Sequence, residues 1–236
     1  MKKLMIAAAA LTAGFAMADI VSSDIVGYAQ SGLKNGGTMT AAQFVNIGDA
    51  TEMDIQQLAA VGDDAADNVV IQTLDFAGRT VDSYIWNDWV DTTPCWVNDS
   101  FEKVEGVTIA PGAAVWVQGT TTSQGIQSAG KVGTSDVVVT LKNGGTLAGN
   151  PFPVAIDIQD VVAQGTDAPD NVVIQTLDYA GRTVDSYIWN DWVDTTPCWV
   201  NDSFEKVEGV TIASGEGLWV QGTTTDQTIR FPAPEL

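Results

Sequence analysis

The stretch NVVIQTLDFAGRTVDSYIWNDWVDTTPCWVNDSFEKVEGVTIAPGAAVWVQGTTT (residues 68–122) recurs at residues 171–225, with 50 of 55 residues identical. Self-similarity at a fixed offset of 103 residues indicates that each copy is one folding unit, and this period suits a small domain better than a solenoid repeat. The sequence therefore predicts two β modules, residues 19–130 and 131–236. The five differing pairs are Phe76/Tyr179, Pro111/Ser214, Ala113/Glu216, Ala114/Gly217 and Val115/Leu218.

The sequence identity between the copies rises abruptly at residue 68. Only 8 of the 21 positions from 47 to 67 match their partners, against 50 of 55 directly afterwards. Such a step is typical of recent copying of one stretch of gene. Repetition alone therefore does not mark a residue as functional.

Short alternating segments separated by turn residues fill most of each copy. In the first copy they cover 68–74, 80–86, 95–97, 100–104, 106–110 and 114–119, and the turn at 75–78 joins the first two. Strands at intervals of 8–12 residues with polar turns favour antiparallel sandwiches or barrels. We expect an all-β, mainly antiparallel fold of two tandem β-sandwich or barrel-like modules.

Several turn signals predict hairpins. The Asn-Gly pairs at 35–36 and 143–144 lie between apolar runs, where a type I′ turn joins paired strands. Trp86 and Trp89 flank a two-residue Asn-Asp turn, which predicts that they face each other as a cross-strand pair. The Pro-Gly turn at 111–112 predicts a further hairpin between its flanking strands.

One short helix is expected in each module. Residues 53–60 and 156–163 space apolar side chains at helical intervals, and Gly62 and Gly165 follow as terminators. We expect each helix to cap an open end of its module.

The first residues read as a secretory signal peptide, residues 1–18. Lys2 and Lys3 precede the apolar run 4–15, and an Ala-Met-Ala cleavage site occupies 16–18. That run is shorter than the ~20 residues a bilayer requires, so no membrane insertion is expected after signal removal. The mature protein is predicted to be exported to the periplasm, the cell surface or the extracellular space.

The chain is strongly acidic, with a net charge of −20 that becomes −22 once Lys2 and Lys3 are removed. Such a surface repels phosphate backbones and anionic lipid, so we do not expect the protein to bind nucleic acid. No cofactor is expected, although Ca²⁺ stays open as an alternative. Its candidate ligands are the acidic residues Asp63, Asp64, Asp67, Asp88, Asp91, Asp167 and Asp170. Because no EF-hand spacing is present, solvated loops are the favoured interpretation.

Cys95 and Cys198 occupy equivalent positions of the two copies. An exported protein permits a disulfide, but equivalent residues meet within one chain only if the modules pack about a near two-fold axis. Buried free thiols, an internal bridge and a bridge between two chains therefore all stay open.

The repeated aromatic segment provides the candidate ligand-binding residues. They are Tyr84, Trp86, Asn87, Asp88, Trp89 and Asp91, with the copies Tyr187, Trp189, Asn190, Asp191, Trp192 and Asp194. Exposed indoles beside amides and carboxylates suit the apolar face and the hydroxyls of a sugar. The alternative is that alternation along 80–86 points these large rings into a small β core, which is the favoured interpretation.

Catalytic constellations are missing from the sequence. There is no histidine, which removes the usual general base, and no nucleophile-elbow or phosphate-binding motif occurs. Glu102 and Glu105 fit exposed strand positions better than a glycosidase pair. We predict that the protein is not an enzyme.

Three segments carry motifs of a known kind, and two of them are LAGNPFPVAIDIQ (147–159) and IASGEGLWVQG (212–222). These two are similar to the GNPFPxAID motif and the IxPGxGxWV segment of exported β-rich repeat modules of Gram-negative bacteria, which have no characterised function. The opening SSDIVGYAQ (22–30) resembles their VGY start. The first copy has QFVNIGDAT in place of the GNPFP stretch and has IAPGAAVWVQG (109–119) at the second motif. The resemblance implies a β-rich exported module and supplies no substrate.

These features together predict a non-enzymatic structural or adhesive interaction protein of the cell surface or extracellular space. Two similar surfaces in one chain suit bivalent attachment or self-association. The alternative is a tandem carbohydrate-binding module that uses exposed Trp hairpins on a surface polysaccharide.

Overall fold

The computed structural model describes residues 26–45, 52–178 and 180–235, and the predicted signal peptide lies outside these ranges. The described chain is all-β and mainly antiparallel, as predicted. Within these ranges no helix has the length and apolar composition needed to cross a membrane. The first module contains β1 (Val26–Gly32), β2 (Gly36–Ala41), β3 (Met53–Asp54), β4 (Leu58–Val61), β5 (Val70–Leu74), β6 (Thr80–Asn87), β7 (Cys95–Val97), β8 (Thr108–Ile109), β9 (Ala114–Gly119) and β10 (Gly125–Lys131). The second contains β11 (Val137–Thr140), β12 (Gly144–Gly149), β13 (Ile156–Asp157), β14 (Val162–Gln164), β15 (Val173–Leu177), β16 (Thr183–Asn190), β17 (Cys198–Val200), β18 (Thr211–Ile212), β19 (Gly217–Gly222) and β20 (Thr228–Phe231).

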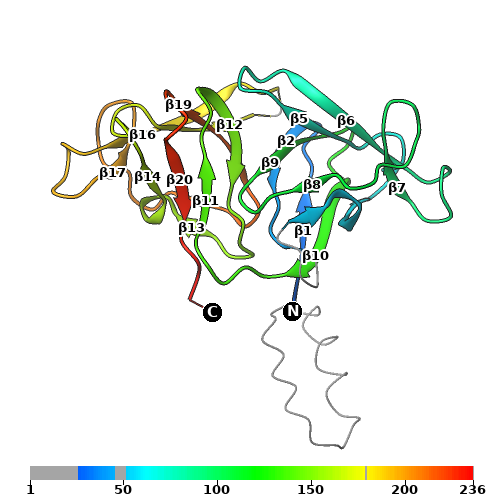
Figure 1. Ribbon diagram of the computed structural model, residues 1–236. Helices are drawn as coiled ribbons and strands as arrows, with labels where there is room; N and C mark the ends of the chain where they lie inside the picture. The colour runs from blue at the N-terminus through cyan, green and yellow to red at the C-terminus, as the bar shows by residue number, and fades with distance from the viewer. Residues whose placement is uncertain (1–25, 46–51, 179, 236) are drawn as a thin grey trace, which may run out of the picture.

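Both modules have the same sheet topology. In the first, a five-stranded sheet has the order β2-β9-β5-β6-β7, a three-stranded sheet has the order β1-β10-β4, and β3 pairs with β8. The second repeats this with β12-β19-β15-β16-β17, β11-β20-β14 and β13-β18. The four larger sheets form a propeller-like ring of four blades rather than two clear sandwiches (Figure 1).

Only part of the hairpin prediction is confirmed. Strands β5 and β6 pair around the turn at 75–78, where the Asp75 carboxylate accepts hydrogen bonds from the backbone N–H of Ala77 and of Arg79, both at 2.9 Å. The Asn-Gly prediction is wrong, because β1 pairs with β10 while β2 pairs with β9. Gly36 has a φ of +114° and turns the chain from one sheet into the next.

The Asn-Gly pair at 143–144 and the Pro-Gly turn at 111–112 fail as hairpins for the same reason. Strand β11 pairs with β20 while β12 pairs with β19, and β8 pairs with β3 while β9 pairs with β2 and β5. In each case the chain turns where the sequence predicts, but the two flanking strands enter different sheets.

The helix prediction is also wrong. Residues 53–60 contain a single 3₁₀ turn, η1 (Ile55–Gln57), between two short strands, and η2 (Ile158–Asp160) repeats it. The Gln56 side chain explains this, since its amide nitrogen donates to the backbone oxygens of Trp96 and Val104 at 2.9 and 2.8 Å. This clamp holds the segment against β7, where the flanking residues complete β ladders instead of a helix.

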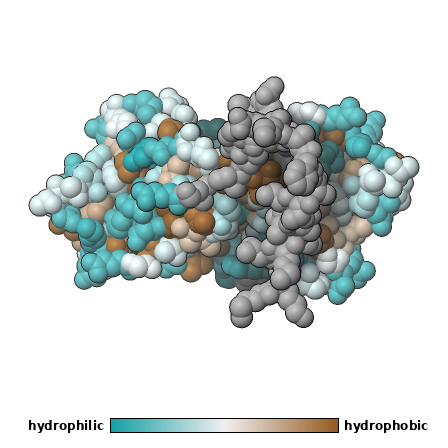
Figure 2. All heavy atoms as spheres, turned by 90° about the horizontal axis from the view of Figure 1, so that it is seen from below, coloured by the Kyte–Doolittle hydropathy of each residue, from teal (hydrophilic) through white to brown (hydrophobic). Residues whose placement is uncertain are grey.

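Each module has its own hydrophobic core among the described residues. The first core draws on residues between Leu33 and Val132, and the second on residues between Leu141 and Phe231. At their centres lie the fully buried indoles of Trp96 and Trp199. Seen from below, hydrophilic residues predominate on both lobes (Figure 2), as the acidic composition requires.

The modules meet through reciprocal contacts. The Ala41 N–H donates to the Gly215 oxygen at 2.9 Å, and its counterpart Gly149 donates to Gly112 at 3.0 Å. Such reciprocity is the mark of a two-fold-related interface, in which each partner offers the same patch. The two modules therefore pack about a pseudo-two-fold axis.

Candidate functional site

The structure separates the predicted ligand-binding residues. Tyr84 and Trp86 are buried in the first core, and Trp86 pairs across the ladder with Trp96, with ring centroids 5.1 Å apart. The prediction that Trp86 faces Trp89 is thus wrong, because β6 continues to Asn87 and its partner strand begins only at Cys95. Burial also raises the pKa of the Tyr84 hydroxyl.

The second copy repeats this arrangement. Trp189 is buried and packs against Trp199 in a tilted arrangement, with ring centroids 5.1 Å apart. Tyr187 is half-buried against the second core. Burial raises the pKa of the Tyr187 hydroxyl as well. These aromatic residues therefore build the cores, as the favoured interpretation proposed.

Asn87 and Asn190 are fully buried and hold loops in place. The side-chain oxygen of Asn87 accepts from the N–H groups of Trp89 and Val90 at 3.0 and 2.9 Å, and its amide nitrogen donates to Asp67 at 2.8 Å. Both ends of the Asn87 side chain therefore hydrogen-bond within the protein, to the loop that follows it and to Asp67.

Asp91 and Asp194 belong to ion pairs. Lys103 donates to the Asp91 carboxylate at 2.5 Å, and Lys206 donates to Asp194 at 2.6 Å. The hydrogen bond from lysine is the main cause that lowers the pKa of each carboxyl group. Their neighbours Asp88 and Asp191 are exposed.

Trp89 and Trp192 remain from the predicted set as exposed aromatic residues. Each packs against a phenylalanine that the sequence interpretation did not select, Phe101 or Phe204. They belong to the loops at the two outer ends of the molecule, beyond β7 and β17 (Figure 1).

The candidate metal ligands and the two cysteines were alternatives that the sequence left open. Among the described residues, no group of three or more His, Cys, Asp or Glu side chains is arranged to hold a metal ion. Cys95 and Cys198 are free and buried in different modules, and burial raises the pKa of each thiol. An internal bridge between them is therefore not formed.

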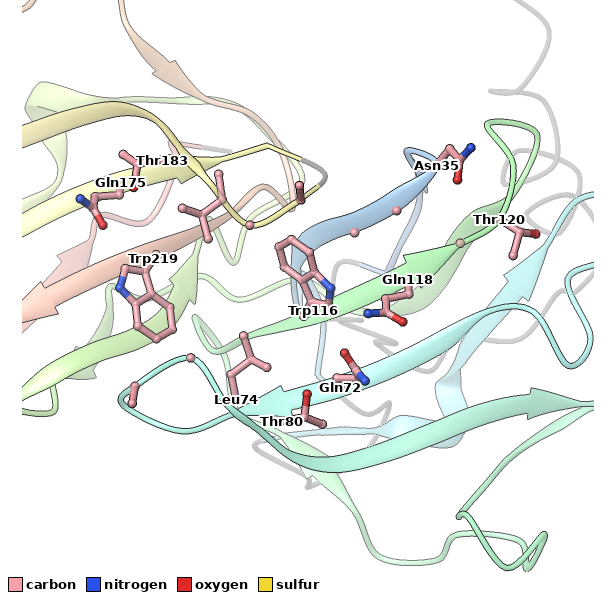
Figure 3. Close-up of a pocket in the computed structure, with 18 of the residues that line it drawn as sticks. Asn35, Gln72, Leu74, Thr80, Trp116, Gln118, Thr120, Gln175, Thr183 and Trp219 are labelled. Carbon is pink, nitrogen blue, oxygen red and sulfur yellow. The ribbon is translucent and has the colours of Figure 1, made fainter.

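A groove of about 870 Å³ lies between the two modules. Figure 3 shows Trp116 and Trp219 beside it, on strands of different modules. No residue of the described structure that lines the groove is charged. Its polar lining consists of Asn35, Asn68, Gln72, Gln118, Gln175, Thr80, Thr120 and Thr183.

The groove contains two indoles, each close to a turn of the other module. Trp116 approaches the second module's turn, where a methyl group on Gly181 would lie 3.9 Å from the indole. Trp219 approaches Gly78 of the first module in the same way, at 3.8 Å. We call the surroundings of these two indoles the Trp116 subsite and the Trp219 subsite.

A second hollow of about 450 Å³ extends the Trp219 subsite. It shares Ala77 and Trp219 with the groove and is also lined by Phe76, Asn143 and Gln221. The Gly145 N–H donates to the Phe76 oxygen at 2.9 Å, which ties the turn of one module to the other. The walls of the groove thus depend on the packing of the modules.

A glycine on the neighbouring strand fixes each groove indole. A methyl group on Gly37 would lie 1.7 Å from the Trp116 ring, and one on Gly145 would lie equally close to Trp219. The rings therefore lie flat over bare backbone, which only glycine permits. This contact covers one face of each indole.

The sequence did not predict these two tryptophans as site residues, although both WVQG segments belong to the repeat. A usable signal was the alternation of Trp116 with Gln118, which places both on one face of a strand. The glycine-rich strands at 36–37 and 144–145 indicate a close approach by another group. The sequence could not predict that Trp116 and Trp219 line the same groove, because that depends on how the modules pack.

The GNPFP segment has a structural role. Asn150 is fully buried and donates to the backbone oxygens of Val154 and Ile212 at 2.6 and 3.2 Å, while its own oxygen accepts from the Phe152 N–H at 2.9 Å. The resemblance that this segment carries stays a prediction. Comparison with protein-family models, curated proteins and solved structures found no match to this chain.

Proposed function

We propose that this is an exported, non-enzymatic interaction protein whose inter-module groove binds a neutral oligosaccharide. The observation that carries the proposal is the lining of the groove, which combines two indoles with uncharged amides and hydroxyls. Indole faces pack against the apolar C–H faces of sugar rings, and amides and hydroxyls exchange hydrogen bonds with sugar hydroxyls.

The charge of the molecule supports a neutral ligand. With a net charge of −20, the protein repels phosphorylated and uronic-acid glycans before they reach the groove. A cationic ligand would meet no carboxylate among the described groove residues. A polar, uncharged molecule is the class that suits both conditions.

The size and symmetry of the groove support a ligand longer than one sugar. A volume of about 870 Å³ falls within the range of small-molecule sites, and the groove is lined by one indole from each module. Each subsite offers one indole, so a short oligosaccharide that reaches both gains two aromatic contacts within one binding event.

The proposal keeps three predictions made from the sequence. Export rests on the signal-like residues 1–18, and the absence of enzymatic activity rests on the lack of histidine and of catalytic motifs. The two modules, predicted at 19–130 and 131–236, are supported by the two separate cores, the first of which extends to Val132. The carbohydrate-binding alternative is thereby moved from the Trp hairpins to the groove.

A glycan array probed with the mature protein, residues 19–236, tests this function. We expect retention on a subset of neutral oligosaccharides and at least about tenfold weaker binding for Trp116→Ala combined with Trp219→Ala, because a buried aromatic anchor contributes roughly 1.4 kcal/mol or more. The matched control is Trp89→Ala combined with Trp192→Ala, which removes two indoles at the outer ends.

The two double variants separate the outcomes. Loss of retention in the groove variant alone supports the proposal. Loss in the outer-end variant alone assigns glycan binding to the outer loops, and no retention of any neutral glycan by the wild-type protein refutes the saccharide proposal.

A further inference from the structure

Each outer end of the molecule carries an exposed aromatic pair. In the first module Trp89 is 61% exposed and Phe101 46% exposed, with ring centroids 5.4 Å apart. In the second, Trp192 and Phe204 are 59% and 43% exposed and 5.2 Å apart. Large rings left in water forgo hydrophobic burial, and such patches mark surfaces that meet another molecule. We call these the outer aromatic pairs.

The rings are held in place before any partner arrives. Phe101 has a φ of +59° and Phe204 one of +57°, a left-handed conformation that a bulky residue rarely adopts. The Asn98 side-chain oxygen fixes this turn by accepting from the backbone N–H of Ser100 and of Glu102 at 2.9 and 3.0 Å. A partner therefore meets a preorganised surface and does not have to order it.

Exposed carboxylates flank the outer aromatic pairs in the sequence, and the nearby Lys103 is already paired with Asp91. Asp88 directly precedes Trp89, Glu102 directly follows Phe101, and Asp99 is exposed in the same turn. In the second module the corresponding acidic residues are Asp191, Asp202 and Glu205. Because the whole molecule is also strongly acidic, a basic partner is attracted while an acidic one is repelled.

Arginine fits this combination best. Its planar guanidinium stacks on an indole face and at the same time pairs with carboxylates, and it is more weakly hydrated than the ammonium of lysine. We propose that the two outer aromatic pairs are equivalent docking surfaces for an arginine-bearing basic segment of another protein.

The placement of the pairs adds a consequence. Their loops lie at opposite ends of the molecule (Figure 1), so one chain can hold two partners at once. A partner that carries two such segments would bind its second site at a raised effective concentration. The docking surfaces are separate from the groove, and this proposal does not depend on the saccharide proposal.

Calorimetric titration of the mature protein with an acetylated, amidated (Gly-Arg)5 peptide tests it. We expect two peptides per chain and an affinity that falls as salt rises. Trp89→Ala should leave one site, and Trp89→Ala with Trp192→Ala should weaken binding at least tenfold. Neither substitution changes the net charge, so attraction by charge alone would survive both. Trp116→Ala in the groove is the matched control and should bind as wild type.

A second variant removes the rings and relieves the backbone. Phe101→Gly with Phe204→Gly permits the left-handed conformation without a side chain. We expect an unfolding midpoint at or above that of the wild type, with peptide binding at least tenfold weaker. The proposal is overturned if the double Trp variant binds the peptide like the wild type, or if (Gly-Ser)5 binds equally well. It is likewise overturned if the Phe→Gly variant loses stability but keeps its affinity, since the pair would then be only structural.

Discussion

Trp96 and Trp199 occupy matching environments in the two modules. Both are fully buried, and each indole N–H donates to a backbone oxygen at 2.7 Å, that of Leu58 in one module and Val161 in the other. The modules differ where they face each other. Four of the five differing pairs in the repeat lie in the segments 111–115 and 214–218, which contribute to the contact between the modules.

The differences at this contact occur in matched pairs. On one side Gln43 donates to the Ser214 hydroxyl, while the equivalent positions on the other side are Pro151 and Pro111. A neighbouring contact differs in the same way. Thr40 forms a β-bridge with Glu216 on one side of the interface, and the equivalent residues on the other side, Ala148 and Ala113, form the matching β-bridge. When one member of a contact differs, its partner differs as well.

This pattern teaches where the two copies are under different constraints. A core indole has the same neighbours in either module, so its residue can stay the same. At a pseudo-two-fold contact the residues of one module pack against residues of the other. A substitution in one module therefore alters the packing of its partner. The following experiments test this contrast.

The largest expected effect comes from the cores. Trp96→Ala and Trp199→Ala should each lower the free energy of unfolding of their own module by about 3–5 kcal/mol, since each leaves a cavity. Urea denaturation should then show two transitions, with equal shifts for the two variants. A single cooperative transition in both variants would contradict separate cores.

Next comes a substitution at the contact itself. A methyl group on Gly217 would lie 2.6 Å from the Met39 side chain, so Gly217→Ala should cost about 1–3 kcal/mol through overpacking. The equivalent residue in the first module is Ala114, and Ala114→Gly should cost only about 0.5–1 kcal/mol. Thermal unfolding of the two variants measures both. Equal effects would mean that the contact is not asymmetric.

The groove allows a comparison of its two subsites. Trp116→Ala and Trp219→Ala should each weaken saccharide binding roughly tenfold, because each subsite has the same indole over the same bare glycine. Affinities measured on the glycan selected by the array check this. If only one variant loses affinity, the ligand uses one indole, and the proposal that both indoles contact it is refuted.

The smallest effect concerns acid. Hydrogen bonds, chiefly from Thr166 and then from Thr224, lower the pKa of Asp226 to about 2, and the equivalent residue of the first module is Ser123. A folded-state pKa below the ordinary 3.8 gives stability that is present above pH 3.8 and is lost as pH falls toward about 2. Denaturation between pH 4 and pH 2 should therefore show a shallower loss of stability for Asp226→Ser than for the wild type. If stability falls equally steeply with pH in the variant and the wild type, Asp226 does not make the second module more sensitive to acid than the first.

Much of the fold could be predicted from local sequence. Alternation and β-branched residues correctly placed β5, β6, β7 and β9, because a half-buried strand imposes that pattern on its own residues. Strand partners could not be predicted from the turns. Gly36 marks where the chain bends, but the ladder partner of β2 is β9, whose residues follow about eighty positions later.

The candidate site shows the same limit. The pattern around Trp86 predicted either a core or a platform, and burial assigns it to the core. The helix expected at 53–60 failed because Gln56 bonds to distant backbone at Trp96 and Val104. The groove was missed because its lining comes from both modules, and only their packing brings Trp116 and Trp219 to one hollow.

The most direct test of the proposed function is the stoichiometry of glycan binding by calorimetry. Both modules line the same groove, so we predict one oligosaccharide per chain, with at least about tenfold weaker binding when Trp116 and Trp219 are both changed to alanine. Two oligosaccharides per chain, bound with unchanged affinity by that double variant, would contradict the assignment of saccharide binding to the groove.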